Sequence, residues 1–217
     1  IADPEKVVSV LKNTPGVTGI TERIIVRGIA STSAGSAGVE ITGIDVEKEQ
    51  QMFTLKDRLI PGTGSWFGAE TRLNSAFIGE KLAKELYIIR YILTEESFAT
   101  LESEGVPAAV AGKLRPLENQ RFTTEKKLSE AFSGLLSAKE VKLYGMKIKE
   151  AAWSYREGSR IILTFLDANG LQTGAAFRIT GIFRTNNDFF EAFSVFVPRD
   201  ELLRLTAMEE GQYHRII

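Results

Sequence analysis

Few side chains in this sequence have the types and spacing that catalysis requires. His214 is the single histidine, it stands close to the end of the sequence, and no carboxylates cluster beside it. A general base or a metal site needs such partners, so we interpret His214 as a solvated tail residue. The Gly-x-Ser-x-Gly turn of serine hydrolases is missing, and so is cysteine. We therefore expect no catalytic residues, no metal and no cofactor.

A glycine-rich segment, Pro61-Gly-Thr-Gly-Ser-Trp-Phe-Gly68, is the one stretch that resembles a phosphate-binding loop. Such loops end in Gly-Lys-Ser or Gly-Lys-Thr, because the lysine and the hydroxyl contact the phosphates and their metal. That ending is absent and no lysine follows the loop. We expect no nucleotide site here. Trp66 and Phe67 either anchor the loop to the core or contact a partner.

Aromatic side chains in loops are the best candidates for contacts with another molecule. Binding residues concentrate on loops that rigid elements hold in place, and a buried aromatic anchor contributes about 2 kcal/mol or more to an interface. The candidate contact residues are Trp66, Phe67, Phe189 and Phe190, and a third loop at residues 31–38 offers only Ser, Thr, Ala and Gly. Core packing is the alternative for each aromatic. A contact role predicts that Phe67→Ala or Phe190→Ala leaves thermal stability nearly unchanged.

The composition is that of a water-soluble globular chain. Of 217 residues, 43% are hydrophobic and 25% are charged, and the net charge is −1. A nucleic-acid-binding protein should show a basic face, so we expect no nucleic-acid partner. No apolar run reaches the roughly 18 to 20 residues that span a bilayer. The sequence starts at Ile1 rather than Met and stops without a polar tail, which favours an excised fragment.

The first third of the chain predicts a hairpin and then a strand and a helix. Residues 22–30 and 39–46 alternate in polarity and read as paired strands with a mobile tip. Residues 74–78 form a short apolar run typical of a buried strand. Residues 80–86 follow as a helix, because Lys and Glu side chains pair at a spacing of four.

Residues 158–205 predict a β-meander that runs into a helix. The run from Phe177 to Phe183 has a period of two, and Asn169-Gly170 is a strong hairpin signal because both residues tolerate a positive φ. We expect a third strand ending at Pro198, a polar loop before it that contains Asp188, and a short helix after it.

Residues 89–157 predict an all-helical block placed between two β regions, as an insertion would be. Thr94 and Thr124 are expected helix caps. Ser137 and Glu140 form a capping box, and their helix is expected to run to Gly158.

Five of these segments resemble, in order, the extracytoplasmic domain of ABC transporter permeases of the MacB, LolC, LolE and FtsX type. Val39-Glu-Ile-Thr-Gly-Ile-Asp45 resembles the family's V-x-x-x-G-I/V-D strand. The segment of residues 76–86 is similar to its Gly-x-x-Leu-Ala-x-x-Leu segment. The starts of the strands at 158 and 177, and Val195-Phe-Val-Pro198 with its helix, resemble its closing blocks. The helical block departs from the compact family pattern.

The resemblance implies an α+β fold of two lobes. Residues 1–60 and 175–217 would form a Porter-like lobe with β-meander and βαβ-like elements. Residues 61–174, including the helical insertion 89–157, would form a Sabre-like lobe. The chain would lie between two membrane spans of the permease, so Ile1 and Ile217 are expected on the same face.

The resemblance also implies a function without catalysis. The domain would lie on the periplasmic side of the inner membrane and couple cytoplasmic ATP hydrolysis to lipoprotein release or substrate export. Its partners would be its own transmembrane helices, the ATPase, a second permease subunit, and a periplasmic carrier or adaptor protein. Two alternatives stay open: an FtsX-like signalling or scaffold domain that regulates envelope enzymes, and a free-standing periplasmic binding protein or enzyme.

Overall fold

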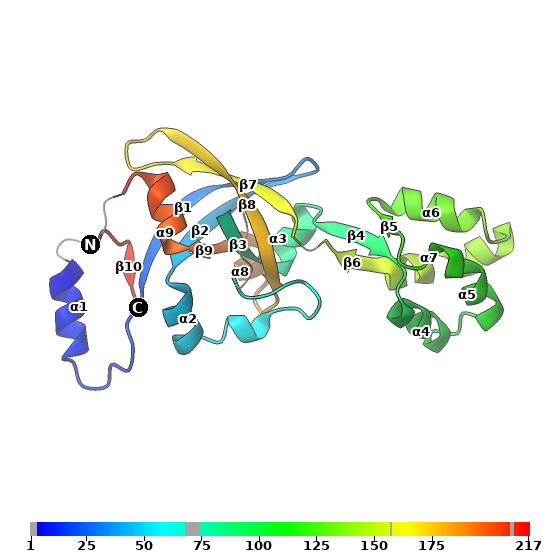
Figure 1. The fold of residues 1–217 in the computed structure, drawn as a ribbon, viewed down its shortest axis with the longest axis horizontal. Coiled ribbons are helices and arrows are strands. Elements are labelled where there is room, and N and C mark those ends of the chain that lie inside the picture. The colour runs from blue at the N-terminus through cyan, green and yellow to red at the C-terminus, as the bar shows by residue number, and fades with distance from the viewer. Residues whose placement is uncertain (1–3, 68–73, 157, 209–210) are drawn as a thin grey trace. The chain divides into compact units, whose positions relative to one another are not determined.

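The computed structural model describes residues 4–67, 74–156, 158–208 and 211–217. The chain divides into two compact units (Figure 1). We call residues 1–88 and 157–217 the barrel unit and residues 89–156 the helical unit. Across the described ranges the fold is α+β with nine α-helices, a closed six-stranded barrel and a separate three-stranded sheet. The expected α+β class is confirmed.

Six strands of the barrel unit close on themselves. Their order around the barrel is β1, β2, β9, β3, β8 and β7, and β7 pairs again with β1. The pairs β2–β9 and β3–β8 are parallel and the other pairs are antiparallel. The strands span β1 Glu22–Ser31, β2 Ser36–Ile44, β3 Asn74–Gly79, β7 Arg160–Leu166, β8 Gln172–Phe183 and β9 Ser194–Pro198. Closure pairs both long edges of the sheet, as in other small barrels.

The seam between β1 and β7 depends on a glycine. Gly28 lies opposite Phe165, and a Cβ added at Gly28 would come 2.4 Å from the carbonyl oxygen of Thr164. On β7, Ile161, Leu163 and Phe165 are buried and alternate with more exposed residues. This period of two is what a strand with one packed face requires. The seam therefore depends on the alternation of buried and exposed residues along β7 and on glycine, which has no side chain, at position 28 of β1.

Two sequence predictions hold for the hairpins, and the expected meander is wrong. The β1–β2 hairpin and the β7–β8 hairpin are confirmed, the latter with its turn at residues 167–170. The predicted long loop at residues 31–38 is wrong, because the strands stay paired up to Ser31 opposite Ser36 and leave a turn at 32–35. However, β9 does not pair with β8, because β3 lies between them. The apolar run of β3 is buried on both faces from Ser75 to Gly79, so it belongs inside the sheet rather than at an edge.

The linker from β8 to β9 is also different from the prediction. Instead of a polar loop through Asp188, the chain forms helix α8, Asp188–Phe193, directly before β9. Helix α9, Arg199–Thr206, follows β9 as predicted and packs against β2, where Leu202 contacts Gly43. The remaining helices of the unit are α1 Pro4–Lys12, α2 Val46–Met52, the 3-10 turn η1 Lys56–Arg58, and α3 Glu80–Glu85.

The last strand of the chain runs beside the first strand of the barrel. β10, Arg215–Ile216, is antiparallel to the start of β1, with Glu22 opposite Ile216. Thr21 and Ile217 exchange two backbone hydrogen bonds of 3.0 and 2.9 Å. His214 is exposed, yet its Nδ1 accepts a hydrogen bond of 3.1 Å from the backbone N–H of Ile25. Ile1, whose position relative to Ile217 was predicted, lies outside the described residues.

The helical unit is not all-helical, which corrects the prediction for residues 89–157. Its first strand, β4 Ile89–Ile92, and its last, β6 Trp153–Tyr155, pair antiparallel, and β5 Arg121–Phe122 completes the sheet. Helix α7, Ala138–Ala152, therefore ends well before Gly158. The segments that enter and leave the unit satisfy their backbone hydrogen bonds by pairing with each other, with Ile89 opposite Tyr155.

The caps predicted in this unit are confirmed. Thr94 starts α4 Glu95–Ser103 and Thr124 starts α6 Glu125–Ser133, and Ser137 and Glu140 form the capping box of α7. Helix α5 Ala108–Leu114 and the 3-10 turn η2 Arg115–Leu117 complete the unit. Its core is its own and includes Leu93, Phe98, Leu101, Leu128, Phe132 and Ile148.

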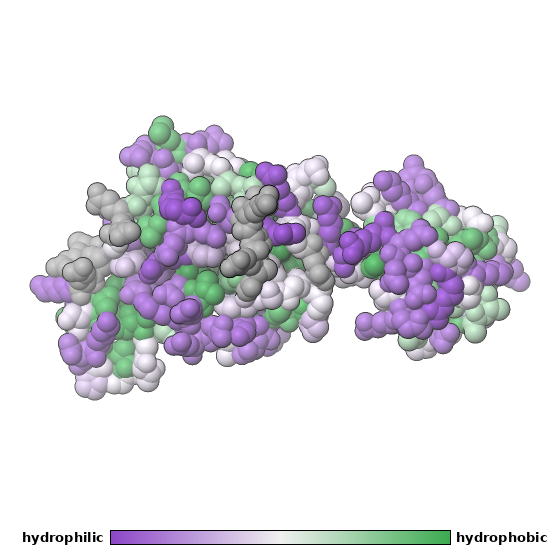
Figure 2. Space-filling view, in the orientation of Figure 1, coloured by the Kyte–Doolittle hydropathy of each residue, from purple (hydrophilic) through white to green (hydrophobic). Residues whose placement is uncertain are grey.

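The two compact units differ from the two predicted lobes. β3 and β7 belong to the barrel together with β1 and β2, whereas the prediction assigned residues 61–174 to a second lobe. The Porter-like and Sabre-like assignments stay a prediction. In Figure 2, hydrophilic and apolar side chains intermix on the visible face of the barrel unit.

Candidate partner-binding site

The structure places the four predicted contact residues in different environments. Trp66 is 8% exposed, and its ring meets those of Phe67 and Phe77 edge-to-face, at 4.9 and 5.0 Å. Phe67 is half-buried against the same core. The packing of both residues supports the anchoring role that sequence analysis left open. The end of their loop, at Gly68, lies outside the described residues.

Phe189 and Phe190 are neighbours in α8 but point to different surroundings. Phe190 is half-buried and packs against Phe183 and Phe196, with ring centroids 5.6 and 6.0 Å apart. Phe189 is 74% exposed, and its ring stacks on that of Phe193, at 5.5 Å. Of the four candidates, Phe189 has the side chain most available to a partner, and its contact role stays a prediction.

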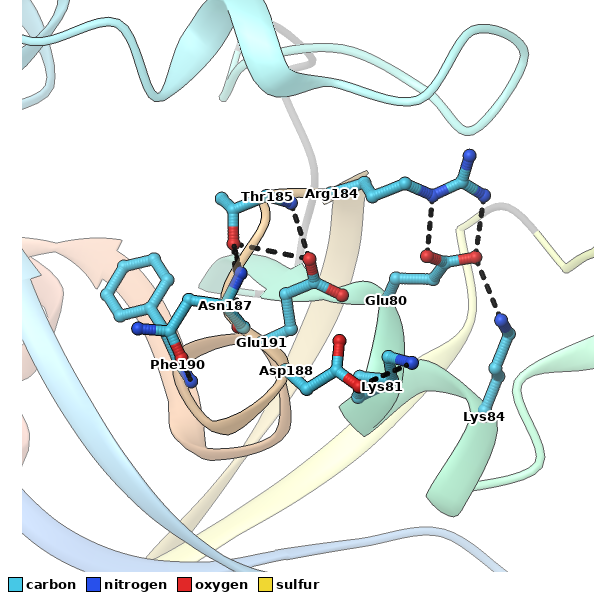
Figure 3. Close-up of polar contacts among 9 residues, drawn as sticks. All are labelled: Glu80, Lys81, Lys84, Arg184, Thr185, Asn187, Asp188, Phe190 and Glu191. Atoms are coloured by element: carbon cyan, nitrogen blue, oxygen red, sulfur yellow. Dashed lines mark hydrogen bonds and ion pairs between the residues drawn. The ribbon is translucent and has the colours of Figure 1, made fainter.

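Polar contacts fix the loop that leads into α8 (Figure 3). Asn187 caps the helix, because its Oδ1 accepts a hydrogen bond of 3.0 Å from the backbone N–H of Phe190. Thr185 donates to Oε1 of Glu191 from its backbone N–H, at 2.5 Å, and from its hydroxyl, at 3.2 Å. Glu191 is 1% exposed. Its buried carboxylate therefore holds the loop backbone in one conformation.

Ion pairs join the same loop and helix to α3 (Figure 3). Arg184 donates to both oxygens of Glu80, at 2.6 and 2.7 Å, and Lys84 approaches the same carboxylate at 3.0 Å. Lys81 and Asp188 pair at 3.0 Å, and the hydrogen bond from Lys81 to Asp188 raises the pKa of Lys81. The exposed pair contributes little, whereas Glu80 is buried and its bidentate partner fixes geometry.

Backbone packing reinforces these contacts. A Cβ added at Gly79, where β3 meets α3, would come 2.1 Å from the carbonyl oxygen of Glu191. Helix α8 therefore rests directly on the backbone of Gly79, and a side chain at this position would push it away. Together, Gly79, Glu80 and Glu191 position α8.

A cavity of about 370 Å³ opens beside α8 in the barrel unit. We call it the α2–α8 pocket, because its walls come from the residues that follow α2 and from the loop and helix at 185–190. Its apolar walls are Phe53, Leu55, Phe190 and Phe196. Phe196 is only 4% exposed, so it forms part of the base rather than the rim.

Two arginines line the polar wall of the pocket, and they differ in whether a carboxylate neutralises the guanidinium. Arg23 donates to both oxygens of Glu49, at 2.6 and 2.7 Å, and its guanidinium lies 5.0 Å from the Phe53 ring. Arg58 also lines the pocket but is exposed, and its side chain makes no hydrogen bond or ion pair with any described residue. Asn186 lies exposed on the opposite wall.

A second cavity, of about 310 Å³, lies in the helical unit. Tyr91, Glu125, Lys149 and Trp153 line it, and Lys149 pairs with Glu125 at 2.7 Å. Burial raises the pKa of the Tyr91 hydroxyl. The remaining charged group of its lining is the exposed carboxylate of Glu150, so this cavity presents no positive charge beyond the one that Glu125 compensates.

Sequence reasoning missed the α2–α8 pocket. Its residues come from segments far apart in the chain, and Arg58 lies in a stretch of mixed character. The one local signal was Asn187, since an Asn followed by Phe189, Phe190 and Phe193 fits a capped helix with apolar residues on one side. No group of three or more His, Cys, Asp or Glu in the described ranges could hold a metal ion.

No protein-family model matches the chain. A search of curated proteins finds no match either. Within the described part of the chain, no helix combines the length and the apolar character that crossing a membrane requires.

Proposed function

We propose that this chain is the extracytoplasmic domain of an ABC transporter permease of the MacB, LolC and LolE type. In this proposal it couples ATP hydrolysis in the cytoplasm to lipoprotein release or substrate export on the periplasmic side of the inner membrane. It acts by contact with carrier, adaptor or permease partners rather than by catalysis.

One observation carries the proposal. The five segments that resemble the permease family fall on β2, on β3 with α3, on β7, on β8, and on β9 with α9. In the barrel these five strands are consecutive neighbours, in the order β2, β9, β3, β8 and β7. Glu40 of β2 pairs with Ser194 of β9, 154 positions further along the chain. Segments this far apart thus belong to one structural body, as expected if the resemblance reflects a shared fold.

The departure from the family pattern also has a structural counterpart. The helical block is a separate unit with its own core, and its first and last strands pair, with Ile89 opposite Tyr155. A unit whose ends lie side by side can be inserted into a host fold without opening it. The insertion therefore does not count against the family fold of the barrel.

Cysteine labelling of the full-length natural protein tests the location. Residues 1–217 contain no cysteine, so in a full-length protein whose other cysteines have been replaced by Ser, Leu171→Cys is one defined thiol at an exposed position in the β7–β8 turn region. We expect a membrane-impermeant maleimide to label it in cells whose outer membrane alone is permeable. Buried Leu163→Cys is the matched control, and it should react only after denaturation.

Coupling is tested in the same cells. The proposal predicts that the full-length protein stays with the membrane, co-purifies with an ATPase, and alters its rate of ATP hydrolysis when Phe189 is replaced by Ala. Labelling that requires lysis of the inner membrane would contradict the proposal. Recovery of the whole protein in the soluble periplasmic fraction would favour a free-standing binding protein instead.

A further inference from the structure

We propose that the α2–α8 pocket binds a small ligand group in which one carboxylate is attached to an aromatic or bulky aliphatic side chain. This inference is independent of the permease proposal, because it rests on the walls and charges of one pocket in the barrel unit. Of the contact residues predicted from the sequence, Phe190 lines this pocket, but a site for a small acid was not among the predictions, and the family resemblance implies none.

The size and the wall residues of the pocket indicate which apolar group a ligand could place in it. A cavity of about 370 Å³ is at the lower end of the roughly 300–1,000 Å³ typical of ligand sites. It has room for one aromatic ring and a short polar end group, not for a large cofactor. Phe53, Leu55, Phe190 and Phe196 surround this space, and aromatic walls favour a ring that can meet them edge-to-face.

The charged residues of the pocket indicate which polar group the ligand carries. Glu49 compensates Arg23 through two hydrogen bonds, and the side chain of Glu49 is only 3% exposed. Arg58 is left as a guanidinium without a described partner. A guanidinium pairs with a carboxylate through two parallel hydrogen bonds. A single uncompensated positive charge matches a monoanion better than a phosphate group with nearly two negative charges.

Both walls are held in place before any ligand enters. On one side, the bidentate contact between Arg23 and Glu49 ties β1 to α2, and Asp45 caps that helix by accepting from the N–H of Lys48 at 3.1 Å. On the other side, the buried carboxylate of Glu191 holds Thr185 beside Asn186. A pocket that needs no ordering on binding retains more of its contact energy as affinity.

An NMR titration of the 217-residue chain tests the proposal. The probes are N-acetyl-L-phenylalanine, its neutral amide, and N-acetylglycine, which lacks the ring. For a ligand of this size we expect a Kd on the order of 0.1–1 mM for the first probe. Its chemical-shift changes should be centred on the amides of Phe53, Arg58 and Asn186. The amide and N-acetylglycine should each bind at least tenfold more weakly.

Matched arginine variants assign the charge. Arg58→Gln should weaken binding of N-acetyl-L-phenylalanine at least tenfold. Arg27→Gln, which removes an exposed arginine of β1 outside the pocket, should leave the Kd unchanged. The amide spectrum of each variant shows whether it is folded. Equal affinity for acid and amide, equal loss in both variants, or no shift changes up to 10 mM ligand, roughly tenfold above the weakest expected Kd, would each overturn the proposal.

A titration with a peptide distinguishes two kinds of ligand that carry the same ring and carboxylate, a free small acid and the C-terminus of a protein chain. A hexapeptide ending in phenylalanine presents the same ring and carboxylate at the end of a chain. If it binds as tightly as the small acid, the pocket recognises chain termini. If it is excluded while the small acid binds, the pocket recognises free acids. If neither binds, the proposal is overturned, whatever the labelling experiment shows about the permease function.

Discussion

The single histidine of the chain reports how the last strand is held against the barrel. Nδ1 of His214 accepts the hydrogen bond of the Ile25 N–H, which requires that nitrogen to carry no proton. Although His214 is exposed overall, the part of its ring that lies against the chain is shielded from water, and this partial burial disfavours the charged imidazolium and lowers the pKa of His214 below its ordinary value. The neutral ring therefore stabilises the fold above pH about 6.5, and this contribution is lost as the pH falls through the lowered pKa.

His214 gives a prediction that NMR can check directly. Since it is the only histidine, one imidazole resonance should titrate, with a midpoint below that of the same chain unfolded in urea. His214→Asn keeps an acceptor but cannot titrate. We expect this variant to show a smaller loss of stability between pH 7 and 5 than the parent. A midpoint equal to or above the unfolded value would show that the imidazole does not act as an acceptor.

Phe189 and Phe190 should respond in opposite ways to truncation. Phe190 packs against two core rings, so Phe190→Ala should lower the free energy of unfolding by about 2–4 kcal/mol. Phe189 is mostly exposed, so Phe189→Ala should change it by less than about 0.5 kcal/mol. Urea unfolding followed by Trp66 fluorescence measures both, in a Trp153→Phe background that silences the helical unit. Equal effects would mean that α8 is oriented differently from the structure.

This packing bears on how a contact role for Phe190 can be tested. The contact prediction from the sequence required a stability unchanged by Phe190→Ala. The packing in the structure leads us to expect a destabilised protein, in which lost transport would be uninformative. Phe189→Ala is the variant that separates partner binding from folding.

At the scale of elements, the direct contact between α8 and the end of β3 leads to a further prediction. In Gly79→Ala the new methyl group would overlap the backbone of Glu191. Helix α8 must move to relieve this overlap, and we expect the free energy of unfolding to fall by about 2–3 kcal/mol. Gly38→Ala is the control, because nothing lies within 4 Å of its added Cβ and its effect should stay below about 0.5 kcal/mol. Urea midpoints compare the two. A Gly79→Ala midpoint near that of Gly38→Ala would contradict direct backbone contact.

Local signals in the sequence were sufficient for some elements and not for others. Asn169-Gly170 fixed a hairpin, and Thr94, Thr124 and Ser137 fixed helix starts, because turn and cap chemistry acts over a few residues. The place of β3 between β8 and β9 depends on pairing across more than 100 residues, which no local pattern encodes. Helix α8 was missed because six residues are too short for a clear helical period.

The candidate site shows the same limit. Phe189 and Phe190 attracted attention because aromatic residues follow a polar loop. Their opposite exposures depend on which side of α8 faces Phe183 and Phe196, and that is decided by the barrel. No local pattern marked Arg58 as a binding residue. Its positive charge stands out only because the neighbouring Arg23 is neutralised by Glu49, and Glu49 lies 26 residues after Arg23 in the chain.

At the scale of the whole molecule, the two units should fold independently. The helical unit has its own core and its ends are paired strands. Ile89 and Tyr155 are antiparallel partners, and such partners are about 5 Å apart, so an Asn-Gly turn between them can replace residues 90–154. We expect that shortened chain, and residues 89–156 alone, each to unfold in one cooperative transition by circular dichroism. A shortened chain without a cooperative transition would show that the barrel unit needs the helical unit.

The order of the barrel strands along the chain has a consequence for how the protein is made. Half of the barrel, β1, β2 and β3, leaves the ribosome before the helical unit, and its partners β7, β8 and β9 leave after it. At 5–20 residues per second, residues 89–156 delay those partners by about 3 to 14 s, whereas a hairpin forms within microseconds. During this delay the nascent chain carries a β1–β2 hairpin and an apolar β3 with unpaired edges. We therefore infer that the barrel is most exposed to misassembly at this stage of synthesis, and that a chaperone which binds extended apolar segments would act there.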